Sequence, residues 1–142
     1  MIRRVLVGLD LSDRTGPVLA WAADLAHRLQ VPLEAMHVVE VPYPSYFPTQ
    51  ATLGDPAWFR QHQPKVEAKL AEHLAPYPEA KGTVLMGNPA EQLIFAAAPG
   101  TLLVVGDVGH SRLHHLLAGG TTTRVVRHAP GDVAVVRTPP RA

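Results

Sequence analysis

Two glycine-rich segments decide the fold of this chain: Val105-Gly106-Asp107-Val108-Gly109 and, after nine further residues, Gly119-Gly120-Thr121-Thr122. The first segment follows an apolar run, and the second opens a helical pattern from about Thr121 to His128 that Pro130 stops. A strand that ends in glycine lets the backbone approach a ligand, because no Cβ intervenes. The free N–H groups and positive dipole end of the following helix favour a phosphate chain. The pattern is neither the dinucleotide fingerprint nor the P-loop.

Five short apolar runs alternate with helical patterns along the chain. The runs are continuous, which is typical of strands buried on both faces of a parallel sheet. Their order predicts an α/β fold with a doubly wound, five-stranded parallel sheet, right-handed crossovers and about four flanking helices. We see no internal repeat and expect one domain over residues 1–142. The predicted strands are Val5–Gly8, Leu33–Val39, Thr83–Met86, Leu102–Val105 and Val133–Val136.

The first three predicted helices differ in how clearly their ends are marked. Ser12 could cap the first helix, but the Gly-Pro pair after Thr15 fits a later start with Thr15 as the cap. The second helix begins at Asp55-Pro56, and Pro64 predicts either a kink or two short helices. The third opens at Asn88, a capping residue with an acid three positions on.

The composition excludes several classes of protein. The formal net charge of +1 gives no basic face for nucleic acid. The absence of cysteine excludes disulfides, thiolate metal sites and cysteine nucleophiles. The apolar run Val5–Leu9 is too short for a signal peptide, and no segment approaches the roughly 18 apolar residues that span a membrane. We therefore expect a cytoplasmic protein with neither a nucleic-acid nor a membrane partner.

Four segments, in the right order over the whole chain, resemble the universal stress protein family. Its ATP-binding members carry Gly-x2-Gly-x9-Gly-Ser/Thr, which corresponds here to Gly106, Gly109 and Gly119. The resemblance implies an adenine-nucleotide alpha hydrolase-like, Rossmann-like fold with strand order 3-2-1-4-5. The other similar segments are Val5–Ser12, His37-Val38-Val39 and Gly87-Asn88-Pro89-Ala90.

The resemblance also implies where ATP would bind. Asp10 would lie near the ribose and adenine, and the Val38 backbone would pair with the adenine edge. Ligands of doubly wound sheets bind at the switch point beyond the strand ends, and with the strand order that the resemblance implies, Asp10 and Gly106 would meet there. The full nucleotide-binding set implied is Asp10, Val38, Val105, Gly106, Gly109, Gly119, Gly120, Thr121 and Thr122.

Gly120 departs from the family pattern, which has serine or threonine directly after the third glycine. A hydroxyl donor to a phosphate contributes roughly 1.5–3 kcal/mol, or about 10- to 100-fold in affinity. The backbone N–H remains, and Thr121 is close enough in sequence to compensate. We therefore expect the chain to bind ATP, but to bind the triphosphate more weakly than family members with serine or threonine at this position. Mg²⁺ could accompany the phosphates.

The loop between the glycines carries histidines that could suggest a metal. His110, His114 and His115 lack carboxylate or cysteine company at a ligand-like spacing, so we expect no metal-ligating cluster. His110 and Arg112 are instead candidate phosphate contacts. No Ser/His/Asp or paired-carboxylate set stands out, so no catalytic residue is predicted.

These observations favour an ATP-binding regulatory or stress-response protein that is not an enzyme. One alternative is a nucleotide-free protein-interaction module of the same family, in which Gly120 marks decay of the phosphate site. A second is a slow ATPase, although the Ser-Gly-Gly-x-Asp-Ser loop of the related ATP pyrophosphatases is missing after the first strand.

Two surfaces could take protein partners. The family usually forms homodimers through the last strand, and Val133–Val136 would leave an apolar edge exposed in a monomer. Aromatic residues also gather around the proline-rich segment 42–59, where they could cover the open end of the sheet or form a lid or partner surface. These aromatic residues are Tyr43, Tyr46, Phe47, Trp58 and Phe59.

Overall fold

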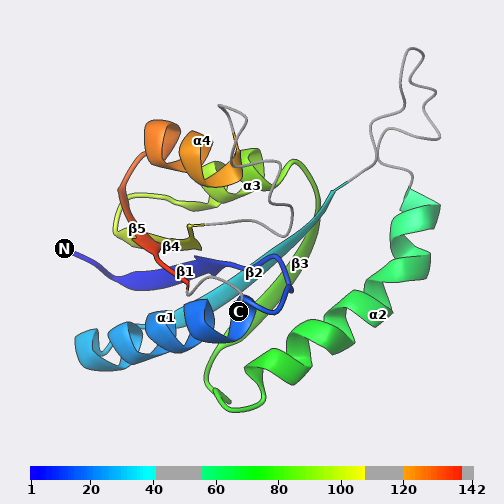
Figure 1. The fold of residues 1–142 in the computed structure, drawn as a ribbon, viewed down its shortest axis with the longest axis horizontal. Coiled ribbons are helices and arrows are strands. Elements are labelled where there is room, and N and C mark those ends of the chain that lie inside the picture. Colours follow the sequence, from blue (N-terminus) through cyan, green and yellow to red (C-terminus); the bar gives the residue numbers. More distant parts are fainter. Residues whose placement is uncertain (41–55, 108–119, 139–142) are drawn as a thin grey trace.

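The computed structural model describes residues 1–40, 56–107 and 120–138, in which strands and helices alternate along the chain (Figure 1). Residues 41–55 and 108–119, which include Gly109, Gly119 and most of the predicted segment 42–59, lie outside the described residues. The elements are β1 (Arg4–Gly8), α1 (Thr15–Leu29), β2 (Leu33–Glu40), α2 (Pro56–Leu74), β3 (Lys81–Gly87), α3 (Pro89–Ala96), β4 (Thr101–Gly106), α4 (Thr121–His128) and β5 (Asp132–Val136).

All five strands belong to one parallel sheet with the order β3-β2-β1-β4-β5. β1 lies at the centre, where Val5 pairs with Leu33 of β2 on one side and with Leu102 of β4 on the other. The chain therefore leaves β1 in one direction and returns to its other side from β4 onward. The predicted doubly wound sheet and its strand order are confirmed.

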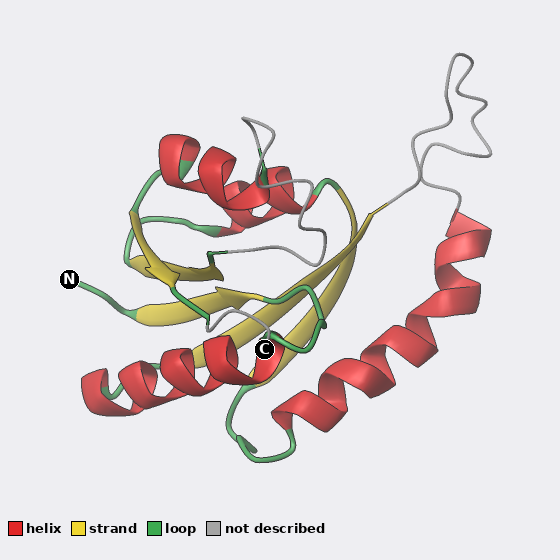
Figure 2. Ribbon diagram, in the orientation of Figure 1, coloured by secondary structure: helices red, strands yellow, loops and turns green. Residues whose placement is uncertain are grey.

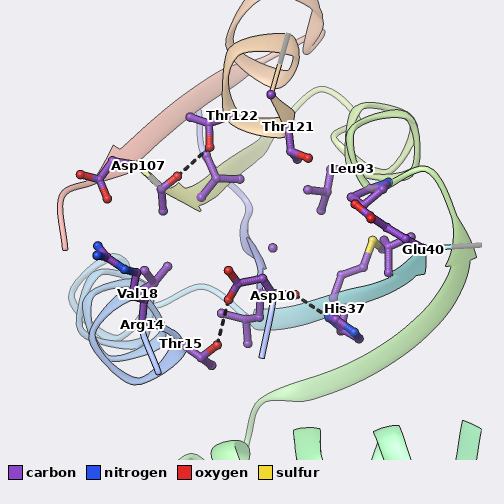
Figure 3. A pocket seen from close by; sticks show the side chains of 18 of the residues that line it. Asp10, Arg14, Thr15, Val18, His37, Glu40, Leu93, Asp107, Thr121 and Thr122 are labelled. Atoms are coloured by element: carbon purple, nitrogen blue, oxygen red, sulfur yellow. Dashed lines mark hydrogen bonds between the residues drawn. The ribbon is translucent and has the colours of Figure 1, made fainter. Parts of the chain in front are cut away.

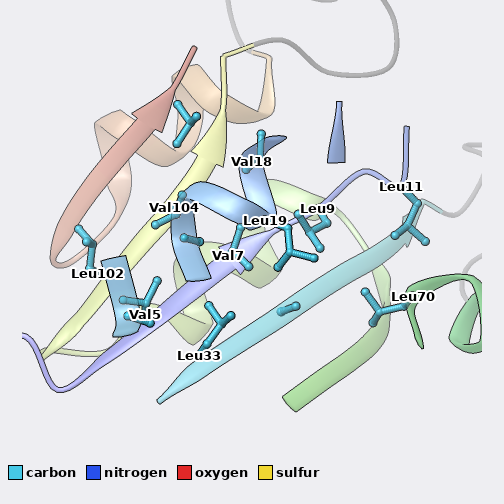
Figure 4. Close-up of a cluster of buried hydrophobic side chains, with 14 of the residues drawn as sticks. Val5, Val7, Leu9, Leu11, Val18, Leu19, Leu33, Leu70, Leu102 and Val104 are labelled. Carbon is cyan, nitrogen blue, oxygen red and sulfur yellow. The ribbon is translucent and has the colours of Figure 1, made fainter. Parts of the chain in front are cut away.

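Helices cover both faces of the sheet (Figure 2). Because neighbouring side chains of a strand point to opposite faces, Val5 and Val7 pack with α1 while Leu6 packs toward α3 and α4. The face under α1 also receives Leu70 of α2, and Figure 4 shows this larger cluster. The continuous apolar runs in the sequence reflect this burial on both faces.

Each strand contains all of its predicted residues and extends by one to three more. Arg4 shows why a strand predicted from apolar residues alone is too short. Its guanidinium donates to Glu34 of β2 at 2.7 Å, to Thr101 Oγ1 of β4 at 2.7 Å and to the carbonyl of Ala96 at the end of α3, so the neighbouring strands and helix satisfy this polar residue. Strand ends can therefore be polar wherever neighbouring elements supply hydrogen-bond partners.

The first helix begins differently from either predicted alternative. α1 starts at Thr15, and its N-cap residue is Arg14, which makes no side-chain capping bond. Both Ser12 and Thr15 are therefore wrong as caps. The Ser12 carbonyl accepts a hydrogen bond from the Thr15 N–H at 3.1 Å, and its hydroxyl accepts one from the Arg14 N–H at 3.2 Å. These bonds form a turn that precedes the helix instead of capping it.

α2 runs unbroken from Pro56 to Leu74, so the alternative of two short helices at Pro64 is wrong. Its C-terminal half is held against β3, where Gly82 allows close approach. A Cβ on Gly82 would lie 2.8 Å from a methyl carbon of Leu74 and 3.1 Å from one of Leu70. This tight packing holds the helix on its strand beyond the interruption at Pro64.

The starts of α3 and α4 agree with their predictions. The Asn88 side chain accepts the Glu91 N–H at 3.0 Å and caps α3. α4 spans Thr121 to His128, with Gly120 as its N-cap residue. The β4–α4 connection is thus the strand-to-helix unit that the glycine-rich segments indicated.

Candidate functional site

A cavity of about 550 Å³ lies at the carboxyl edge of the sheet, beyond the ends of β1, β2 and β4. Its walls also include the first residues of α3 and α4, and residues before and within α1. Because β1 is followed by α1 on one face and β4 leads to α4 on the other, the connections diverge here and leave an opening. Figure 3 shows side chains from these elements around that opening.

Asp10 lies directly beyond β1, in the turn to α1 (Figure 3). Its Oδ1 accepts hydrogen bonds from the Ser12 N–H at 3.0 Å, the Ser12 hydroxyl at 2.7 Å and the Thr15 hydroxyl at 3.4 Å. Within the described residues, Oδ2 has no hydrogen-bond partner, so it is available to a ligand. Three donors on one oxygen fix the carboxylate at the cavity wall.

Leu11 has a left-handed backbone with a φ of 58°. This conformation is unfavourable for a residue with a Cβ, by roughly 1–2 kcal/mol. It allows the chain to bury the Leu11 side chain, which is 8% exposed, while Asp10 and Ser12 remain at the turn. Strained residues of this kind often lie next to functional sites.

The end of β2 forms the opposite wall. His37 Nδ1 lies 2.7 Å from the Leu9 carbonyl oxygen, and since that oxygen can only accept, Nδ1 carries the proton. This bond holds the turn after β1 against β2. The apolar part of the wall is formed by Met36, Val38, Leu93 and Val105.

The start of α4 closes the cavity above β4. The Thr122 hydroxyl donates to the Gly106 carbonyl at 2.7 Å and joins the helix to the strand end (Figure 3). Gly120 has φ −58° and ψ 162°, so its backbone does not require glycine. The N-terminus of α4 therefore faces the cavity with free N–H groups and the positive end of its dipole.

A polar chain links three segments beside the cavity, and sequence reasoning missed it. Arg14 donates to the Thr138 hydroxyl at 2.5 Å, and Thr138 donates to Asp107 Oδ1 from its hydroxyl at 2.9 Å and its N–H at 3.1 Å. Arg14 and Asp107 line the cavity. Asp107 stood within the glycine-rich segment, but nothing in the sequence joined it to Arg14.

Seven of the nine predicted nucleotide-binding residues line this one cavity. Gly109 and Gly119 lie outside the described residues, as do the candidate phosphate contacts His110 and Arg112. The seven are Asp10, Val38, Val105, Gly106, Gly120, Thr121 and Thr122.

The other predicted sites lie only partly within the described residues. His114 and His115 lie outside it, and among the described residues no group of three or more His, Cys, Asp or Glu could hold a metal ion. Of the predicted aromatic surface, Trp58 and Phe59 lie on α2, where Trp58 stacks on His62 at a ring-centroid distance of 4.3 Å. Within the described ranges, no helix is both long and apolar enough to cross a membrane.

The fold and the position of its cavity define a doubly wound α/β protein with a small-molecule-sized opening at the sheet switch point. The sequence matches the universal stress protein family over residues 1–137. The chain belongs to that family.

Relatives agree with this assignment. A universal stress protein of Mycolicibacterium smegmatis is 34% identical over an alignment of 144 positions, which covers 94% of this chain and 45% of that protein. This chain thus spans about half the length of that curated relative.

Two solved structures share the fold. The universal stress protein UspA from Lactobacillus plantarum is 27% identical, with a TM-score of 0.72 over 95% of this chain and 97% of that one. A universal stress protein solved in complex with cAMP is 24% identical, with a TM-score of 0.70 over 96% of this chain and 97% of that one.

Proposed function

We propose that this chain binds an adenine nucleotide, ATP, in the cavity at the carboxyl edge of its sheet and acts as a nucleotide-dependent regulatory protein. The observation that carries the proposal is the convergence of seven predicted nucleotide-binding residues from separate segments on one cavity. Its volume of about 550 Å³ lies within the usual range for small-molecule sites. The cAMP complex of a related protein with the same fold supports an adenine ligand.

The adenosine would occupy the end of the cavity nearest β2. Met36, Val38 and Leu93 offer apolar contact for the faces of a base, and strand-end backbone groups can pair with its edge. Asp10 Oδ2 is available to accept from a ribose hydroxyl, because the hydrogen bonds of this carboxylate within the described chain go to Oδ1. Because adenosine is uncharged, this end of the cavity needs no positively charged side chain to bind it.

The phosphates would extend toward the start of α4. Free N–H groups and the positive dipole end favour an anion there. The Thr121 hydroxyl has no hydrogen-bond partner in the part of the chain that is described, so it can donate to a phosphate. The Thr122 hydroxyl donates its proton to Gly106 and is not available without breaking that bond.

The test is the identity of any nucleotide that the purified protein carries. Mass spectrometry of the supernatant after heat denaturation is expected to detect ATP in an amount comparable to that of the protein. Calorimetric titration of nucleotide-stripped protein then gives affinities for ATP, ADP, AMP, cAMP and adenosine. Failure of all five ligands to bind would favour the nucleotide-free interaction module, and release of ADP over time from bound ATP would favour the slow ATPase.

A further inference from the structure

The described lining of the cavity is negatively charged. It carries the carboxylates of Asp10, Glu40 and Asp107 and a single arginine or lysine, Arg14. A phosphate chain in a partly enclosed cavity is repelled by the half-buried carboxylates of Asp10 and Asp107, because like charges interact more strongly where solvent screening is reduced, whereas Glu40 is exposed to solvent. A phosphorylated ligand therefore depends on the position of Arg14.

Arg14 is fixed in place on the phosphate side of the cavity. In Figure 3 it lies on the same side as Asp107, with His37 and Glu40 on the other side. Its guanidinium donates to the hydroxyl of Thr138, a residue that is only 8% exposed and is itself anchored on Asp107. Since that hydroxyl donates its one proton to Asp107, it must accept from Arg14, so the direction of both bonds is set.

The guanidinium still has donors to offer. Of its five N–H groups, one makes the bond to the Thr138 hydroxyl, which leaves donors on the guanidinium for a ligand. A planar guanidinium can bind two phosphate oxygens at once, and an arginine that is already held in position loses less conformational freedom on binding.

We propose that Arg14 is the phosphate-binding cation of this cavity and the residue that makes the cavity prefer phosphorylated adenine nucleotides to adenosine. The proposal rests on the proposed function, since it concerns the same ligand. It assigns a role to a residue that lies before α1 and outside the glycine-rich segments. Asp107 and Thr138 act as positioning residues, because they hold the guanidinium without binding the ligand.

The experiment is calorimetric titration of ATP and adenosine into the native protein and into Arg14→Gln, Arg14→Lys and Thr138→Val. In R14Q, ATP affinity is expected to fall about 10- to 100-fold, while adenosine affinity changes less than about twofold. R14K keeps the charge but not the paired geometry, so its loss is expected to be intermediate. T138V removes the bond to Arg14 but leaves its charge, and its loss is expected to be smaller than that of R14Q. Raising the salt concentration is expected to narrow the difference between native protein and R14Q.

The outcomes distinguish this proposal from the proposed function. A native protein that binds neither ligand overturns both. A native protein that binds both ligands, with ATP affinity unchanged in R14Q, overturns only the role of Arg14. Equal losses for ATP and adenosine in R14Q also overturn it, because Arg14 would then act on the structure alone. Thermal unfolding of each variant verifies that it is folded before titration.

Discussion

Replacing Gly120 with serine tests the phosphate end of the cavity. Gly120 is the N-cap residue of α4, with φ −58° and ψ 162°, a backbone conformation that serine adopts readily. The mutation therefore adds a hydroxyl at the helix N-terminus without forcing a change of backbone. Thr122 does not already supply this group, since its proton is donated to the Gly106 carbonyl.

The expected gain in ATP affinity follows from the negative charge of the phosphates. A hydroxyl that donates to a phosphate contributes roughly 1.5–3 kcal/mol, which is about 10- to 100-fold in affinity. The N-cap effect itself is small, because serine exceeds glycine at this position by only a few tenths of a kcal/mol. ATP binding and thermal stability should thus respond very differently to Gly120→Ser.

Calorimetric titration of ATP and adenosine measures the effect, with Gly120→Ala as the matched control. Alanine adds the Cβ but no hydroxyl, so G120S should bind ATP more tightly than G120A, while adenosine affinity stays the same in both. Equal ATP affinities of G120S and the native protein would show that the phosphates do not reach Gly120 or that Thr121 already donates to them. Weaker ATP binding by both variants would refute the inference that a side chain fits there.

Three further predictions concern the rest of the molecule. Asp10→Ala leaves the Ser12 and Thr15 donors without their acceptor, so it should weaken adenosine binding and lower the free energy of unfolding by about 1–3 kcal/mol in urea denaturation; unchanged adenosine affinity would remove Asp10 from the site. Val135 is 43% exposed on the edge strand β5, and we propose that it lies in a homodimer interface; Val135→Lys should shift the mass measured by light scattering from dimer to monomer, and a native monomer at high concentration would contradict this. Leu103→Ala should lower the free energy of unfolding by about 2–5 kcal/mol in the same urea denaturation, because this side chain is fully buried under α3 and α4. A decrease below about 1 kcal/mol would mean that the core repacks to fill the space left by the leucine side chain.

The sheet and its helices could be predicted because their signals are local. Continuous apolar runs marked the strands, and Asn88 and the threonines after Gly120 marked two helix starts. The start of α1 could not be predicted in this way, since its N-cap is Arg14, a residue with no capping side-chain bond. The turn before it depends on bonds among Ser12, Arg14 and Thr15 that several capping patterns would satisfy equally well.

The candidate site was predictable where it coincides with strand ends and glycines. Asp10 and Gly106 could be placed together from the switch-point rule, applied to the strand order that the family resemblance implied. The chain from Arg14 through Thr138 to Asp107 could not, because it joins residues 124 and 31 positions apart that share no motif. Long-range polar contacts of this kind depend on the packing of complete elements, which a local pattern does not encode.

The central position of β1 has a consequence for the growing chain on the ribosome. β1 is synthesised first, yet its partner β4 follows about a hundred positions later, as the 97-residue separation of Arg4 and Thr101 shows. At typical rates of synthesis, roughly 5 to 20 seconds pass before β4 can pair with it. During that interval the β3-β2-β1 half presents an open apolar strand edge, the kind of edge on which chains aggregate. The nascent chain is therefore most exposed to misassembly before β4 has been made, and a chaperone that covers strand edges would act in that interval.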